Sequence, residues 1–351
     1  MAKASIALNR FGLGARPGAA PGDDPVRWLL AQFDRYDTRP QTIAALAPSG
    51  RIATELNDYL REVRTLQREK RRNAAAQPDM ETEPAMRGST MQAMPEKQGK
   101  TNDPVAQARR FARQQGRDHY AGAVSARALV ALNSPAPFVE RLVHFWANHF
   151  AVSADKLTMV GLAGSLEFEA VRPHVLGKFA DMLHAVERHP AMLVYLDQAQ
   201  SVGPNSAFGR AGGRRGQKAG LNENLAREIL ELHTLGARTG YSQADVTEFA
   251  RAMTGWTVAG LGRGRGPAYA DTGEAGSFVF APRLHEPGTR TILGKSWPQP
   301  GEAQAASVLD LLATHPATAR HLATKLARHF AGDEPPPALV GRLETAFLRS
   351  G

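Results

Sequence analysis

One stretch of the sequence, residues 222–256, constrains the fold more than any other because it combines helical periodicity with dense polar chemistry. At 100° per residue its first part separates into a polar and an apolar arc, which predicts an amphipathic helix. The polar arc holds Glu223, Asn224, Arg227, Glu228, Glu231 and Thr234, and the apolar arc holds Leu225, Ala226, Ile229, Leu230 and Leu232. Gly236 then supplies a natural end for this helix.

The polar arc allows two interpretations. Glu223–Arg227 and Arg227–Glu231 are spaced i,i+4, so the arc can be a solvated face held by weak ion pairs. It can also be a catalytic surface that includes Glu228. His233 lies on the apolar side, where a histidine is either a hydrogen-bonded core residue or a ligand.

A second helix is predicted after the turn. Ser242 is a good N-cap, and Asp245 places a carboxylate in the first turn. Apolar residues then recur at helical spacing as far as Trp256, which predicts a helical hairpin with a buried face. The turn carries little positive charge, which disfavours a DNA-reading helix-turn-helix.

Residues 134–150 form another polar and aromatic segment. Ser134 followed by Pro135 predicts a helix start there. The spacing predicts an apolar stripe and a polar row, and Glu140, His144 and Asn148 form the row. His149 lies one turn after Trp146, so it is either a core histidine or a general base or metal ligand.

Several long motifs occur in one order along the chain. They are ALNRFGLGARPG (7–18), FWANHF (145–150), RPHVLGKFADML (172–183), HPAMLVYLD (189–197), NENLAREILELHTLG (222–236) and FVFAPRLHEPGTRTILG (278–294). Together they resemble the bacterial domain-of-unknown-function family number 1800. The resemblance implies a mainly helical bacterial protein without an agreed activity or cofactor. The family usually has aspartate where Glu286 stands, and its members tend to run on past the point that matches Gly351, which implies a truncated C-terminal region.

Composition removes several classes of protein. The chain of 351 residues has no cysteine, which excludes disulfides, thiolate metal sites and thiol nucleophiles. The N-terminus has no signal-peptide pattern, and no run approaches the length of a transmembrane helix. The expected location is therefore cytoplasmic, although the resemblance leaves export open because some relatives are thought to be exported.

The net charge of +9 raises the question of a nucleic-acid partner. Residues 51–118 contain fourteen Lys or Arg and ten Asp or Glu, and we expect the basic excess to lie in flexible connectors. Specific nucleic-acid recognition is therefore disfavoured, whereas nonspecific contact with polyanions stays open. The glycine-rich loop 209–220 is either a disordered connector or an anion site at the start of a helix near Asn222. Its basic residues are Arg210, Arg214, Arg215 and Lys218.

Five segments are expected in a mainly α, bundle-like fold. The first, 1–47, is helical, and 48–118 is a charged helix with a largely disordered linker over 73–104, followed by a second helix from Pro104. Residues 119–258 form the helical core, 259–300 contain a glycine-rich loop with an extended or β-hairpin excursion near 276–294, and 301–351 form C-terminal helices.

Two functions from different classes fit the sequence. The first is a hydrolase-type enzyme in which His149 or His233 is the base, Glu228 or Glu231 assists it, and Arg227 stabilises an oxyanion. A metal version would use His149, His233 and Glu231. The second is a non-enzymatic scaffold or accessory protein that binds another protein. An enzyme should gather these groups around a pocket, whereas a scaffold should disperse them or pair them in the interior.

Further candidate ligand-binding residues come from the same motifs. They are Trp146, Asn148, Asn222, Asn224, Asp245, Arg251, Trp256 and His285. The sequence identifies no cofactor.

Overall fold

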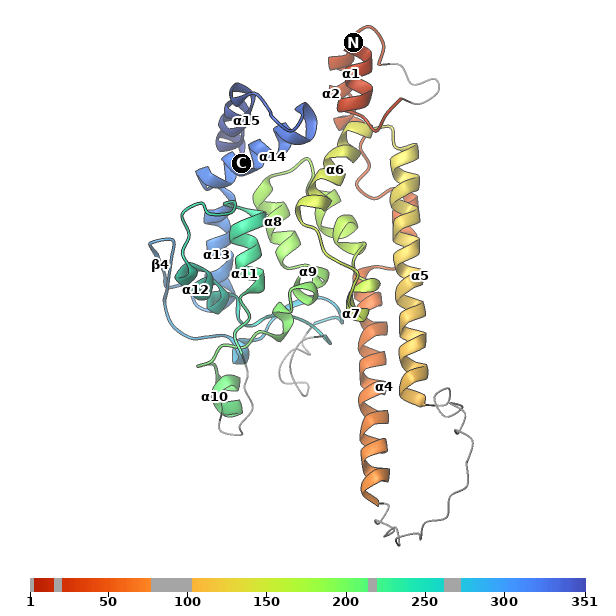
Figure 1. Cartoon of the computed structure of the whole chain (residues 1–351), viewed down its shortest axis with the longest axis vertical. Coiled ribbons are helices and arrows are strands. Elements are labelled where there is room, and N and C mark those ends of the chain that lie inside the picture. The colour runs from red at the N-terminus through yellow and green to blue at the C-terminus, as the bar shows by residue number, and fades with distance from the viewer. Residues whose placement is uncertain (1–2, 16–20, 77–102, 214–219, 262–272) are drawn as a thin grey trace, which may run out of the picture.

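The computed structural model describes residues 3–15, 21–76, 103–213, 220–261 and 273–351. Over these ranges the chain is mainly α-helical, with two small antiparallel sheets of two strands each, as predicted. Figure 1 shows a helical body and a pair of long helices, α4 and α5, that project from it. No helix in the described ranges is long and apolar enough to cross a membrane.

The N-terminal part supplies the projecting pair. Its elements are α1 (Lys3–Arg10), α2 (Pro25–Leu30), η1 (Phe33–Arg35), α3 (Gln41–Ala44), α4 (Ser49–Ala76) and α5 (Pro104–Asn133). His119 bonds Glu55 at 2.7 Å and Lys70 lies 3.6 Å from Asp103, so the two helices run antiparallel. α4 continues to Ala76, past residue 73 where the disordered linker was predicted to begin, and residues 77–102 of the predicted linker lie outside the described ranges.

The prediction that the basic excess lies in flexible connectors is wrong for residues 51–118. Eleven of the fourteen Lys and Arg residues between 51 and 118 lie on α4 and α5 rather than in a connector. Each helix has apolar residues along the side that faces the other helix. Val63 of α4 and Ala108 of α5 are buried on these sides. The arginines are compatible with helix because their side chains lose little rotamer freedom in it.

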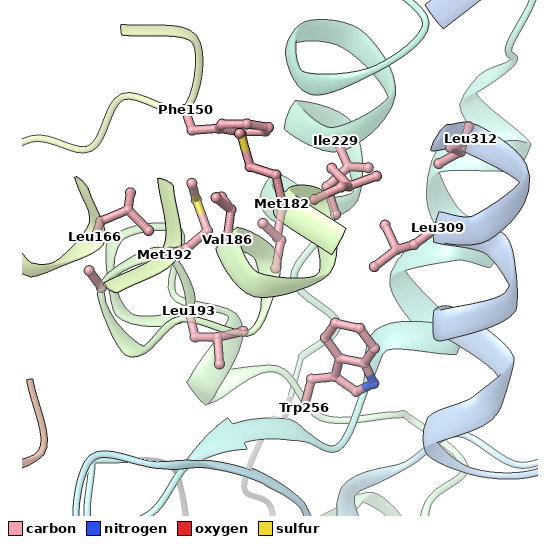
Figure 2. Packing of buried hydrophobic residues seen from close by; sticks show 14 of the residues in the cluster. Phe150, Leu166, Met182, Val186, Met192, Leu193, Ile229, Trp256, Leu309 and Leu312 are labelled. Carbon is pink, nitrogen blue, oxygen red and sulfur yellow. The ribbon is translucent and has the colours of Figure 1, made fainter. Parts of the chain in front are cut away.

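The body contains the remaining helices and helical turns. They are α6 (Pro137–His149), α7 (Leu157–Val160), η3 (Glu167–Val171), η4 (Arg172–His174), α8 (Phe179–Glu187), α9 (Pro190–Tyr195), η5 (Gln198–Gln200), α10 (Ala207–Gly213), α11 (Asn224–Glu228), η6 (Ile229–His233), α12 (Gln243–Met253), η7 (Pro282–Leu284), α13 (Glu302–Ala313), α14 (Pro316–Ala331) and α15 (Pro337–Ser350). One main apolar core joins most of them, and Figure 2 shows Met182, Ile229 and Leu309 from three different helices packed within it. A smaller cluster lies under α10 and η7, and another lies between α14 and α15.

The predicted extended excursion near 276–294 is present, and its strands belong to two separate two-stranded sheets. β1 (Trp256–Val258) pairs with β2 (Phe278–Phe280), and β3 (Arg290–Ile292) pairs with β4 (Lys295–Trp297). Trp256 was predicted on the face of α12, but the helix ends at Met253. Gly255, with φ of 91°, turns the chain so that Trp256 enters the core from a strand.

The start of α6 also lies later than predicted. The first helical residue is Pro137, because Ser134 caps the end of α5 and its Oγ accepts a hydrogen bond from the Ala136 amide. Glu140 then faces inward instead of joining an exposed polar row. Its carboxylate forms a two-pronged ion pair with Arg172 at 2.6 and 3.0 Å, and both side chains are 2 % exposed. The pair fastens α6 to η4 inside the body.

Candidate functional site

Four side chains from distant segments meet in the body, and we call them the central network. His149 ends α6, Glu187 ends α8, His233 ends η6, and Lys325 lies within α14. The rings of His149 and His233 lie 6.2 Å apart between centroids. The structure therefore brings together the two histidines that the sequence singled out.

A π-helical turn positions His233. The predicted helix is α only over Asn224–Glu228, and it continues as the π turn η6 over Ile229–His233. A π turn holds more residues than an α turn, so side chains after Glu228 rotate relative to the α-helical expectation. Leu232, predicted on the apolar side, is 47 % exposed, and Thr234, predicted on the polar side, is buried with its Oγ donating to Ile229 O at 2.6 Å.

The hydrogen bonds of His149 define its protonation. Lys325 Nζ donates to His149 Nδ1 at 2.7 Å, and His149 Nε2 donates to the carbonyl oxygen of His233 at 3.0 Å. This arrangement requires a neutral ring with its proton on Nε2. Burial lowers the pKa of His149 well below its usual range, and the charge of Lys325 lowers that pKa further. Both ring nitrogens are occupied, so His149 has no lone pair directed at a substrate or metal.

His233 is held by a carboxylate that the sequence interpretation did not include. His233 Nδ1 donates to Glu187 Oε1 at 2.8 Å, and the two side chains are 5 % and 0 % exposed. Glu187 Oε2 is buried without a hydrogen-bond partner among the described residues. The pair has the hydrogen-bond geometry of an oriented imidazole, but it lies in the closed interior.

Aromatic and further histidine side chains surround the central network. Trp146 stands edge-on to His149 with centroids 5.3 Å apart, and Phe150 contacts both histidine rings at 4.6 and 5.1 Å. His321 of α14 lies 6.1 Å from His149, and its Nε2 donates to Leu232 O at 3.3 Å. Cavities of about 450, 290 and 260 Å³ elsewhere in the protein do not include any network side chain in their linings.

The structure does not bring Arg227, Glu228 and Glu231 to the two histidines. Arg227 bonds Glu223 at 3.2 Å and Gln243 at 2.9 Å on the half-exposed side of α11. Glu231 forms a hydrogen bond with Tyr241, and Glu228 is half-buried. Within the described ranges no three His, Asp or Glu side chains are grouped as metal ligands. The set His149, His233 and Glu231 is therefore not arranged around one ion.

The other candidate ligand residues divide between capping, core and surface positions. Asn222 Oδ1 accepts from the Asn224 amide at 2.8 Å at the start of α11, and Asn224 itself is exposed. Ser242 is the N-cap as predicted, Asp245 forms a capping box with it, and the second oxygen of Asp245 accepts from the Leu293 amide at 2.7 Å. These side chains are occupied in holding local structure.

The remaining candidates are similarly distributed. Arg251 pairs with Glu248, and Trp256 is buried under the Arg188 guanidinium at 5.3 Å. His285 Nδ1 donates to Thr254 O at 2.9 Å, and burial lowers its pKa. Asn148 is exposed at the edge of the 290 Å³ cavity. Of the proposed anion loop, Arg210 is exposed on α10, and Arg214, Arg215 and Lys218 lie outside the described ranges.

Glu286, the position at which the family resemblance implied aspartate, has a tight geometric role in this chain. Its two carboxylate oxygens accept from the amide and side-chain nitrogens of Asn205 at 2.7 and 2.6 Å. A Cβ at Gly203 would lie 2.6 Å from Glu286 Oε2, so only glycine fits there. The longer side chain thus reaches and fixes the loop that precedes α10.

Sequence reasoning missed Glu187 and Lys325. Lys325 had a local signal, because it follows His321 and precedes His329 at i,i+4 on a helix whose neighbouring positions are apolar. Glu187 had none beyond its place between two family motifs.

Comparison with known proteins adds one match. No curated protein and no solved structure matches the chain. A family model described as "Protein of unknown function (DUF1800)" matches residues 6–351, essentially the whole described body and the α4–α5 pair. The chain therefore belongs to the DUF1800 family, as its motifs indicated.

Proposed function

We propose that this chain is a non-enzymatic helical scaffold protein and that the central network stabilises its body by linking four helical segments. The observation that carries the proposal is the pairwise occupation of the two histidines in the interior. His149 is bonded on both ring nitrogens, and His233 is bonded to Glu187. A catalytic histidine needs a nitrogen within hydrogen-bond reach of a substrate. The ring of His149 offers none because both of its nitrogens are bonded, and the ring of His233, bonded through Nδ1, is only 5 % exposed.

The energetics of the network support this role. Four segments that are far apart in the sequence share hydrogen bonds among charged and neutral groups in a low-dielectric interior, where such bonds are strong. Removing one partner leaves buried groups unsatisfied, at about 1–3 kcal/mol each. Glu187 and Lys325 thus hold α8 and α14 against the ends of α6 and η6.

The test combines metal analysis with stability. Elemental analysis and urea unfolding are carried out on the purified chain, on His149→Ala and on His233→Ala, with the half-buried His174→Ala as the matched control. We expect no stoichiometric metal in any sample and a loss of about 2 kcal/mol or more in the two network variants, against less than about 0.5 kcal/mol in the control.

Two outcomes would contradict the scaffold role. The first is near-stoichiometric metal that disappears in both network variants, which would place the histidines in one metal site. The second is full stability in both variants, which would remove the structural role of the network.

A further inference from the structure

The outer halves of α4 and α5 form a basic projection that the body does not cover. We call residues 61–76 and 103–118 the outer arm, and Figure 1 shows it extending away from the other helices. It contains ten Lys or Arg and four Asp or Glu, and nine of the ten basic residues are arginine. A large share of the basic excess of the chain is therefore concentrated on the outer halves of two helices.

The arginines of α4 follow a stripe. Arg61, Arg64, Arg68, Arg71 and Arg72 recur at spacings of three and four and cover roughly 100° of the helix circumference at 100° per residue. The acidic residues of this half, Glu62 and Glu69, fall outside that arc. All five arginines are exposed. Five of the six basic residues in this half of α4 thus lie on one side of the helix, and the sixth, Lys70, lies outside the arc, 3.6 Å from Asp103.

Packing within the arm leaves this stripe accessible. Val63 of α4 and Ala108 of α5 are each 8 % exposed and mark the seam between the helices. The arginine stripe lies away from Val63 around α4. Sixteen residues of α4 rise about 24 Å, a length over which duplex DNA presents many phosphates, at about one charge per 1.7 Å.

We propose that the outer arm binds the phosphate backbone of nucleic acid without sequence preference. Arginine suits this partner because its planar guanidinium forms paired hydrogen bonds with phosphate oxygens. A membrane-surface helix would need a continuous apolar face opposite its basic side. Among the described residues of the outer arm, Phe111 is the exposed large apolar side chain, which does not make such a face.

The proposal adds a partner to the scaffold role proposed above, but it does not depend on it. A catalytic body would leave the arm's charges unchanged, and a scaffold body would survive the failure of nucleic-acid binding. The two proposals can therefore fail separately.

The test measures binding of the full chain to a short DNA duplex of arbitrary sequence over a range of salt concentrations. The arm variant replaces Arg64, Arg68, Arg71 and Arg72 with Gln. The matched control replaces Arg27, Arg328, Arg342 and Arg349 with Gln, which are exposed arginines outside the outer arm, and so removes the same charge elsewhere. Melting curves of both variants check that the body is folded.

We expect the arm variant to bind about tenfold or more weakly at low salt, with a salt-dependence slope smaller by about three to four, at about 0.9 per lost phosphate contact. The control should bind within about threefold of the unmodified chain, because its arginines make no phosphate contact. An equal loss of duplex affinity in the two variants would overturn the proposal, because it would show that binding depends only on the net charge of the chain. Absence of duplex binding would also overturn it, whether or not the chain binds phosphatidylglycerol vesicles.

Discussion

The body and the outer arm use arginine in opposite ways. In the body, Arg172 is withdrawn from water, bonded to both oxygens of Glu140 and to the carbonyl oxygens of Asp37 and Thr38. In the arm, Arg64, Arg68 and Arg71 remain in water on one side of a helix. A buried charge must be fully paired to be tolerated, whereas a solvated charge costs little and can be used by a partner. The buried arginine therefore stabilises the fold, whereas the exposed arginines of the arm are available to bind a partner.

The same contrast applies to apolar packing, and one pair of variants measures it. Val143 of α6 is 0 % exposed in the core, and Val63 of α4 is 8 % exposed in the seam of the arm. Val143→Ala should cost about 2–3 kcal/mol, because the lost methyl groups leave a cavity in a core closed on all sides. Val63→Ala should cost about 1 kcal/mol, since a two-helix seam can close over the gap.

Urea unfolding of the two valine variants, followed by circular dichroism, supplies the comparison. The difference depends on how well each site collapses, not on the chemistry of the change, which is identical. Equal costs would mean that the outer arm is packed as tightly as the body, and the distinction between the two regions would fail.

Acid should weaken the body through its buried histidines. The pKa of His149 in the folded chain is depressed by burial and by Lys325, and burial lowers the pKa of His144 to about 4. Below the unfolded pKa of about 6.5, the unfolded chain takes up protons that the folded chain does not. These histidines therefore reduce stability as the pH falls from about 6.5 towards 4.

The contribution of His149 can be isolated with His149→Gln, which keeps a donor and an acceptor but does not titrate. Between pH 6 and pH 5 the unmodified chain should lose up to about 1.4 kcal/mol more than this variant, one proton per pH unit. The measurement is the free energy of unfolding at each pH. Parallel pH profiles would show that His149 is already protonated in the folded chain.

Local signals allowed much of the fold to be predicted from the sequence. The N-cap at Ser242, the long charged helix after Ser49 and the helix from Pro104 all depend on neighbours within a few residues. The predicted meeting of His149 and His233 was one alternative among several. Confirmation required the structure, because 84 positions separate them.

What the sequence could not supply depends on contacts between distant segments. The π turn at Ile229–His233 has the same residues that an α-helix would accept, so packing determines its register. Glu187 binds His233 across 46 positions and Lys325 binds His149 across 176. The periodicity placed Trp256 on a helix, but the positive φ of Gly255 turns the chain before it, so Trp256 lies on a strand.

The smallest expected effect concerns the stability of the arm itself. Arg64, Arg68 and Arg72 are like charges spaced i,i+4 along α4, and each such pair destabilises a helix by about 0.2–0.5 kcal/mol. Arg68→Gln removes two of these pairs, together about 0.4–1 kcal/mol of repulsion within the arm, so we expect slower amide exchange along residues 61–76. Added salt should produce the same slowing in the unmodified chain, because it screens exposed charges.

Hydrogen-exchange mass spectrometry at low and high salt measures this effect, with Arg342→Gln on α15 as the control. Faster exchange in Arg68→Gln would mean that the guanidinium supports the helix, as buried Arg172 supports the body. Slower exchange would mean that the stripe repels itself in the free protein. Phosphates on a bound duplex would relieve that repulsion, so the same exchange experiment repeated with DNA should protect α4 in the unmodified chain more than in the variant.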